Sequence, residues 1–273
     1  LSFFAAPGHI LPKAVKKKPV PAPQARTSSA KALAESNALA TGLNPEQTQA
    51  VHSSAAVTAV IAGPGAGKTK TLVSRIAWMI QSGQAKPSEI TAVTFTRQAA
   101  GELQARLEQE LGGKKAIRGL TVGTFHAICQ KLLDARPVLS QHEITLELKK
   151  LLLETGEKLS PKALQQAISR IKNGIPGADS QVDPELLSLW SRRMKEIGVR
   201  DLDDLLLEAL TLDLKGKKSF THLLVDEFQD INPVQHHLVE HWSHYAKSLF
   251  VIGDPDQSIY GFRGADAACF QRL

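Results

Sequence analysis

Two patterns of apolar positions alternate along most of the chain. Four short runs are β-rich and almost continuously apolar, at residues 57–63, 90–95, 222–227 and 248–254. Such runs are typical of strands that are buried on both faces of a parallel sheet. The first three runs are each followed by apolar residues at helical spacing, at 68–81, 97–111 and 233–245. This alternation predicts an α/β fold in which helices cover a parallel sheet.

The strand pattern disappears between residues 141 and 214. Four segments there repeat apolar residues at the spacing of an amphipathic helix. Ser160 before Pro161 and Asp183 before Pro184 are typical helix starts. Three glycines suit helix ends, namely Gly156, Gly174 and Gly198. We therefore predict a helical insertion at 141–214 that divides the α/β domain into 43–140 and 215–273.

Residues 1–42 have a different composition, rich in Pro, Ala, Lys and Ser. Such a segment buries too little apolar surface to offset its ordering entropy, so it is predicted to be a disordered linker. It holds six basic residues against Glu35 alone, a net charge of +5 out of +6 for the chain. The high pI of about 9.3 is therefore weak evidence for nucleic acid binding. A linker here, and a first residue that is not Met, indicate a fragment with an upstream fused domain.

Several classes of protein are disfavoured by composition. No apolar run approaches the roughly 20 residues of a membrane-spanning helix, so we expect no membrane partner. The first ten residues lack the basic start of a secretory signal. Cys129 and Cys269 are too few for a disulfide framework and are expected to be reduced thiols. These features favour a cytoplasmic protein.

The segment "AGPGAGKT", residues 62–69, follows a predicted strand and opens a predicted helix. This is the context of a phosphate-binding loop, in which glycines let backbone N–H groups point at phosphate oxygens. Lys68 would reach the β- and γ-phosphates, and the Thr69 hydroxyl would bind Mg²⁺. The alternative is a glycine-rich turn without a ligand, and the flanking strand and helix favour the phosphate loop. Its predicted contact residues are Gly63, Pro64, Gly65, Ala66, Gly67, Lys68 and Thr69.

Acidic residues end the predicted strand of "LLVDEFQD", residues 223–230. Parallel sheets bind ligands at the carboxyl ends of their strands, so Asp226 would hold the magnesium and Glu227 would deprotonate an attacking water. A base that activates water favours hydrolysis over a kinase reaction. The alternative is that an acidic side chain caps the next helix, which we expect for Asp230 only.

Six segments resemble one family closely and occur in its order: "LNPEQTQAV", "AGPGAGKTKT", "AVTFTRQAAGEL", "TVGTFHAICQKLL", "LLVDEFQDINPVQ" and "VIGDPDQSIYGFRGA". They are similar to the first motor domain of UvrD/Rep/PcrA-type superfamily 1 DNA helicases. The resemblance covers residues 43–273. It implies a RecA-like P-loop NTPase domain, with the helical insertion in the place of a shortened 1B subdomain.

The resemblance also implies roles that the residues alone do not. Gln47 would read the adenine edge, which makes the nucleotide ATP, bound with Mg²⁺. Gln257 would contact the γ-phosphate and report its loss. Lys70 stands near the adenine where many relatives carry Arg, and Lys does not replace Arg in stacking. Gln257 lies three residues before Tyr260, so we hypothesise that phosphate state and base contact are coupled there.

Single-stranded DNA, or a junction of single and double strands, is the partner that the resemblance implies. Aromatic faces grip bases without reading their sequence. The residues expected at the DNA are Phe95, Thr124, His126, Tyr260, Phe262 and Arg263. For Phe125, burial in the core and DNA contact remain equally open. Trp190 and Trp242 fall on apolar helix faces and are predicted to be core residues, while His236 and His237 have no partner at metal-binding spacing.

The leading hypothesis is the ATP-binding domain of an ATP-dependent DNA helicase that moves 3′ to 5′. The alternative is a nucleotide-gated DNA-binding module that serves a fused nuclease or repair domain. In this family ATP lies between two RecA-like domains, and the second is expected to be missing from this chain. We therefore expect weak binding of Mg-ATP and DNA, slow hydrolysis, and no unwinding by these 273 residues alone.

Overall fold

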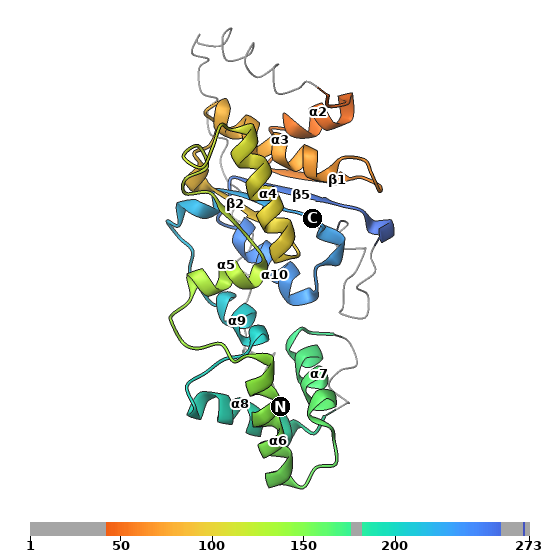
Figure 1. Ribbon diagram of the computed structural model, residues 1–273, viewed down its shortest axis with the longest axis vertical. Coiled ribbons are helices and arrows are strands. Elements are labelled where there is room, and N and C mark those ends of the chain that lie inside the picture. Colours follow the sequence, from red (N-terminus) through yellow and green to blue (C-terminus); the bar gives the residue numbers. More distant parts are fainter. Residues whose placement is uncertain (1–41, 176–181, 258–269, 271–273) are drawn as a thin grey trace, which may run out of the picture.

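The computed structural model describes residues 42–175, 182–257 and 270. It contains a sheet covered by helices and, at the other end of an elongated molecule, a group of helices (Figure 1). None of the helices in these ranges is both long enough and apolar enough to cross a membrane. The predicted α/β architecture with a parallel sheet is confirmed.

All the strands of the sheet are parallel and stand in the order β1-β5-β4-β2-β3. Their bounds are β1 Val57–Ile61, β2 Ile90–Val93, β3 Thr121–Gly123, β4 His222–Val225 and β5 Ser248–Gly253. Four of them are the predicted strands. The sequence did not predict β3, because three residues are too short to show a periodic pattern and this edge strand pairs only with β2.

Helices cover both faces of the sheet. One face is covered by α2 (Pro45–Val51), α3 (Lys68–Gln81) and α4 (Arg97–Glu110), whose Leu72 and Leu103 pack on the sheet. The other face is covered by α5 (Phe125–Leu132), α9 (Leu202–Ala209) and α10 (Pro233–Ser243).

Aromatic residues fill the core under this second face. Trp242 is fully buried and its ring stacks on Phe125 at 5.8 Å between ring centroids. Phe125 is itself buried. The prediction that Trp242 is a core residue is confirmed, and the open question about Phe125 is decided in favour of the core.

The helical insertion has a core of its own, built by α6 (Gln141–Thr155), α7 (Pro161–Lys172) and α8 (Pro184–Glu196). Trp190 is buried in it, as predicted. Ser160 and Asp183 cap α7 and α8, each with proline following, and Gly156 ends α6 in the left-handed region. By contrast α9 packs against α5 and α10, so its Leu205 and Leu206 belong to the core under the sheet.

Four short 3-10 turns complete the described elements: η1 (Pro87–Glu89), η3 (Lys218–Phe220), η4 (Phe228–Asp230) and η5 (Pro255–Gln257). The prediction that Asp230 caps the next helix is wrong. Asp230 lies in the turn η4, which comes between β4 and α10. Asn232 is therefore the N-cap of α10, and its side chain accepts a hydrogen bond from the N–H of Gln235. Asn232, Pro233 and Gln235 together form a capping box with proline at its start.

Candidate nucleotide and DNA site

The predicted site residues lie at one edge of the sheet. Because the strands are parallel, all their carboxyl ends meet at this edge. The ends of β1, β5 and β4 bring the phosphate loop beside Asp254 and Asp226. The ends of β2 and β3, next in the order, bring Phe95 and Thr124. The nucleotide residues and the described DNA candidates therefore occupy neighbouring stretches of the same edge.

The loop of residues 62–69 has the backbone that a phosphate cradle needs. Gly65 and Gly67 have φ of 70° and 79°, a region that glycine adopts without strain. No described atom lies within 4 Å of a Cβ built on Gly65, so there is open space over the loop. Helix α3 begins at Lys68, and no side chain caps its first turn. A helix N-terminus of this kind favours an anion.

Gln47 ties the helix before β1 to this loop. Its side-chain N–H donates to the carbonyl of Ala66 at 2.8 Å, and its side-chain oxygen accepts from the N–H of Asn44 at 2.9 Å. Lys70 lies in the first turn of α3, and its side-chain ammonium donates to the carbonyl of Gly42 at 2.5 Å. Gln47 and Lys70 thus both lie beside the phosphate loop, and their contact with adenine stays a prediction.

Lys68 and Glu227 come together across the edge of the sheet. The Lys68 Nζ lies 3.6 Å from the Glu227 Oε2, and the lysine side chain is only 11% exposed. Glu227 has φ of 47°, in the left-handed region that a residue with a side chain seldom adopts. Its Oε2 also accepts from the side-chain amide of Gln229 at 2.8 Å. The predicted phosphate lysine and the predicted base are therefore neighbours.

Asp226 is placed where a cation would be stabilised. Burial, and next the charge of Glu227, raise the pKa of Asp226 to about 6. The same two causes raise the pKa of Asp230 to about 6. A divalent cation would relieve this repulsion.

The donor set fits Mg²⁺. Within the part of the chain that the structure describes, no three His, Cys, Asp or Glu side chains gather as a metal cluster. Mg²⁺ usually takes one or two carboxylates together with substrate phosphates and waters. Asp226, with the hydroxyl of Thr69 at the start of α3, matches that requirement.

Gln229 connects the ends of β4 and β5, and sequence reasoning missed it. Gln229 is buried. Its side-chain N–H donates to the Glu227 carboxylate, and its Oε1 accepts from the backbone N–H of Asp254 at 2.9 Å. Gly253 leaves it room, because a Cβ there would collide with the Gln229 Oε1. The one signal in the sequence was an amide next to acidic residues at the end of a predicted strand.

Two buried polar atoms follow β5 without a hydrogen-bond partner among the described residues. They are the Asp254 Oδ2 and the Gln257 Nε2. The backbone of Gln257 is held, because its N–H donates to the carbonyl of Asp254 at 3.0 Å. Buried polar groups almost always have partners, so these two atoms are available to bond a ligand or a water.

The described DNA candidates lie at the ends of β2 and β3. Thr124 is the N-cap of α5 and accepts from the N–H of Ala127 at 3.3 Å. His126 is half-buried in the first turn of α5, where burial, and next the charge of Arg97, lower its pKa. Phe95 is half-buried. The other three candidates, Tyr260, Phe262 and Arg263, lie outside the described residues.

Comparison with known proteins agrees with this arrangement. The family described as "UvrD/REP helicase N-terminal domain" matches residues 43–273. The chain belongs to this family. The "ATP-dependent DNA helicase srs2" of Schizosaccharomyces pombe is 32% identical over 269 residues, which cover 82% of this chain and 30% of that protein. The "ATP-dependent DNA helicase PcrA" of Staphylococcus epidermidis is 31% identical over 261 residues, covering 84% and 35%.

A third relative gives the same result. The PcrA of Staphylococcus aureus is 31% identical over 260 residues, covering 84% of this chain and 35% of that protein. The chain thus spans about a third of the length of the relatives that it matches. The predicted relationship to UvrD/Rep/PcrA-type helicases and the RecA-like motor fold are confirmed for this UvrD/REP helicase N-terminal domain.

Proposed function

We propose that this chain is the ATP-binding motor domain of an ATP-dependent DNA helicase that moves 3′ to 5′ along single-stranded DNA. One observation carries the proposal: Lys68 of an open phosphate loop lies 3.6 Å from Glu227, which follows the half-buried Asp226 at the end of β4. The names of the relatives support DNA and ATP as substrates. The direction of movement rests on the family resemblance alone.

The chain's own residues divide the work of hydrolysis. The backbone of residues 63–69 and the Lys68 ammonium hold the β- and γ-phosphates, which anchors the reacting end of the nucleotide. Thr69 and Asp226 would hold Mg²⁺, which neutralises phosphate charge when bound. Glu227 accepts a proton from the attacking water. To do so, its carboxylate gives up the contact with Lys68. Gln257, whose Nε2 has no partner among the described residues, would contact the γ-phosphate and report its loss.

The DNA track in this proposal runs along the ends of β2 and β3. Phe95, Thr124 and His126 contribute from the described chain, and Tyr260, Phe262 and Arg263 continue the track. Single-stranded DNA, or its junction with a duplex, is the proposed substrate. A second RecA-like domain supplies arginines to the transferred phosphoryl group, and we propose a cytoplasmic setting for the complete enzyme.

Calorimetry with a nonhydrolysable ATP analogue and Mg²⁺ tests the nucleotide site. We expect Lys68→Ala to weaken binding at least about tenfold, because hydrogen bonds to charged groups contribute about 1.5–3 kcal/mol. Lys162→Ala, an exposed lysine of α7, is the matched control and is expected to bind as the wild type does. Absence of binding by the folded wild-type chain at millimolar analogue would overturn the proposal.

A further inference from the structure

A second surface lies at the opposite edge of the sheet, where the amino ends of the strands meet. It consists of the loops before β5, β4, β2 and β3, which are residues 244–247, 213–221, 84–89 and 111–120; we call it the basic edge. All of its basic side chains are exposed: Lys247, Lys215, Lys217, Lys218, Lys86, Lys114, Lys115 and Arg118. These loops lie toward the left of the sheet in Figure 1.

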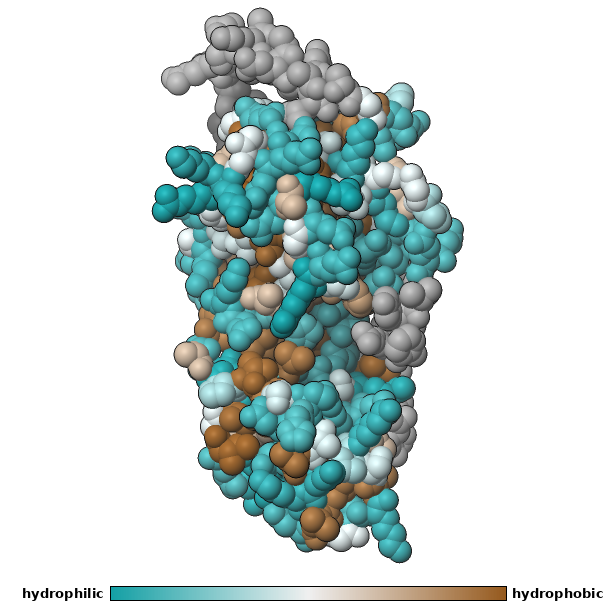
Figure 2. Space-filling view, in the orientation of Figure 1, coloured by the Kyte–Doolittle hydropathy of each residue, from teal (hydrophilic) through white to brown (hydrophobic). Residues whose placement is uncertain are grey.

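Charge is segregated to this edge. Its loops hold eight basic residues and two acidic ones, Asp213 and Glu89, a net charge of +6. Residues 43–273 as a whole have a net charge of only +1, since residues 1–42 hold +5 of the chain's +6. The rest of the motor domain is therefore net negative. Strongly hydrophilic side chains project from this side of the upper half of the molecule in Figure 2.

The four loops form one continuous surface. The N–H of Lys247 donates to the carbonyl of Thr221 at 2.7 Å, which joins the loops before β5 and β4. The Thr91 hydroxyl donates to the carbonyl of Ser219 at 2.7 Å, which joins the loop before β4 to β2. Ser88 lies against Gly119, where a Cβ would approach the Ser88 Cβ to 3.0 Å. Strands are spaced about 4.8 Å apart, so the three intervals from β5 to β3 span roughly 15 Å.

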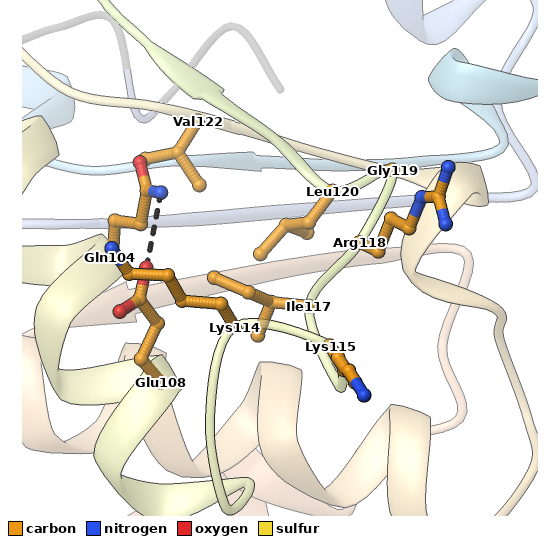
Figure 3. A pocket seen from close by; sticks show the side chains of 9 residues that line it. All are labelled: Gln104, Glu108, Lys114, Lys115, Ile117, Arg118, Gly119, Leu120 and Val122. Carbon is orange, nitrogen blue, oxygen red and sulfur yellow. Dashed lines mark hydrogen bonds between the residues drawn. The ribbon is translucent and has the colours of Figure 1, made fainter.

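The loop before β3 borders a cavity of about 390 Å³. Figure 3 shows Lys114 extending across this cavity toward Gln104 and Glu108, while Lys115 and Arg118 point away from it. The loop can bend in this way because Gly112, Gly113 and Gly119 have positive φ. Two of its three cations therefore face solvent.

Within the described chain, no carboxylate holds any of these eight cations in a close ion pair. A hydrogen bond from the Lys86 backbone, followed by the charges of Lys86 and Lys247, lowers the pKa of Glu89. Burial, and next Lys247, lower the pKa of His222. Lys247, from the loop before β5, thus acts on a carboxylate in the loop before β2 and on a histidine of β4.

The composition of the edge indicates the class of partner. Protein interfaces have apolar and aromatic centres and are depleted in lysine. Of the large apolar residues of these loops, Ile117, Leu214 and Phe220 are buried. The others, Leu111, Leu120 and Tyr245, are half-buried. Seven of the eight cations are lysines. The one exposed ring on the described loops is that of His244, which does not provide the row of aromatic faces on which the bases of a single strand stack. Phosphates of a duplex, at one charge per about 1.7 Å, suit such a lysine surface.

We propose that the basic edge is a second nucleic acid site, which binds the phosphate backbone of duplex DNA on the side of the sheet opposite the nucleotide. The contact is independent of base sequence, because lysines on phosphates position a duplex without reading it. A motor domain with this surface holds duplex DNA away from the track along β2 and β3. The site requires neither nucleotide nor the proposed hydrolysis.

Binding of a fluorescent duplex of about 20 base pairs, followed by anisotropy over a range of salt concentrations, tests the proposal. The test variant carries Lys115→Gln, Lys217→Gln, Lys218→Gln and Lys247→Gln. The control variant loses the same charge from exposed lysines of the insertion, through Lys149→Gln, Lys158→Gln, Lys162→Gln and Lys195→Gln. Both keep residues 1–42, so the basic tail contributes equally.

We expect the test variant to bind duplex at least about tenfold more weakly at low salt, and the slope of log affinity against log salt to fall by about 2–4. The control should stay within about twofold of the wild type. Equal loss in the two variants, or an unchanged slope in the test variant, would overturn the proposal. So would a test variant that loses binding of a polyglutamate peptide but keeps the duplex, since that identifies an acidic protein partner. Binding of the ATP analogue should be unchanged, which separates this test from that of the proposed function.

Discussion

Glu227 shows at the scale of a single residue how this site stores strain. Its left-handed backbone costs about 1–2 kcal/mol for a residue with a Cβ. The cost is offset locally, because its N–H donates to the Asp226 Oδ1 at 3.0 Å and its carboxylate accepts from Gln229. The result is a carboxylate held toward Lys68. Strain at such positions is common where a reacting group has to be oriented.

The raised pKa of Asp226 predicts how stability depends on pH. The folded chain keeps this proton up to about pH 6, whereas the unfolded chain releases it near the ordinary value of 3.8. The stabilisation is therefore complete below about pH 4 and is lost as the pH rises through 6, by up to about 3 kcal/mol. Asp226→Asn removes this loss, because its amide oxygen can still accept from Glu227. Urea unfolding should find the variant more stable than the wild type at pH 7.5 and similar to it at pH 4.

Asp213→Asn serves as the control for this measurement, since Asp213 is exposed and lies at the other edge of the sheet. Its effect should be small at both pH values. A difference between Asp226→Asn and the wild type that does not change with pH would contradict the prediction.

At the scale of helices, a buried polar junction joins the insertion to the element that follows the candidate base. Asn173, at the end of α7, donates to the Asp203 Oδ1 of α9 at 2.7 Å and accepts from the side chain of Asn232 at 2.7 Å. Asn232 is the N-cap of α10, five residues after Glu227. Lys172 beside it donates to Asp201 at 2.6 Å. Side-chain hydrogen bonds thus hold the three helices α7, α9 and α10 together.

We expect Asn173→Ala to destabilise the fold by about 1–3 kcal/mol, because it leaves buried groups of Asp203 and Asn232 without this partner. Burial, and next Asp201, raise the pKa of Asp203, so its carboxyl depends on donors such as Asn173. Hydrogen exchange should become faster at the end of α7 and in the first turn of α10. Gln166→Ala, on the exposed side of α7, should change stability by less than about 0.5 kcal/mol. Unchanged exchange at α10 in Asn173→Ala would contradict the junction's role.

In the complete molecule, two chain segments connect the sheet to the insertion, one around Pro137 and one around Arg200. The N–H of Arg200 donates to the carbonyl of Pro137 at 3.0 Å, and its carbonyl accepts from Leu139 at 2.9 Å. The guanidinium of Arg200 is almost completely buried, and it pairs with Asp134 and, at 3.0 Å, with Glu208. The insertion is therefore anchored by charge as well as by backbone bonds.

Arg200→Met is expected to destabilise the anchoring of the insertion by about 2 kcal/mol, through loss of hydrogen bonds to charged groups. Hydrogen exchange should accelerate in α6, α7 and α8 while β4 and β5 keep their protection. Arg192→Met, an exposed arginine of α8, is the control and should leave both parts unchanged. Equal acceleration in sheet and insertion would show that the two parts open together and would count against this prediction.

Features that depend on local spacing could be predicted from neighbouring residues. The phosphate loop between β1 and α3, the caps at Ser160 and Asp183, and the acidic end of β4 were all predicted, because a few neighbouring residues are enough to specify each. Their order along the chain also carried the family resemblance. The roles assigned to Gln47, Lys68 and Glu227 stay predictions until binding is measured.

Features that join distant segments arise only when the chain folds. The strand β3 exists because β2 offers it hydrogen bonds, and Asn232 rather than Asp230 caps α10 because of the turn before it. The packing of α9 under the sheet, the bridge made by Gln229, and the gathering of lysines from four separate loops have the same origin. Each requires residues that are far apart in sequence to meet, and strand order sets those meetings, which no local pattern of apolar and polar residues encodes.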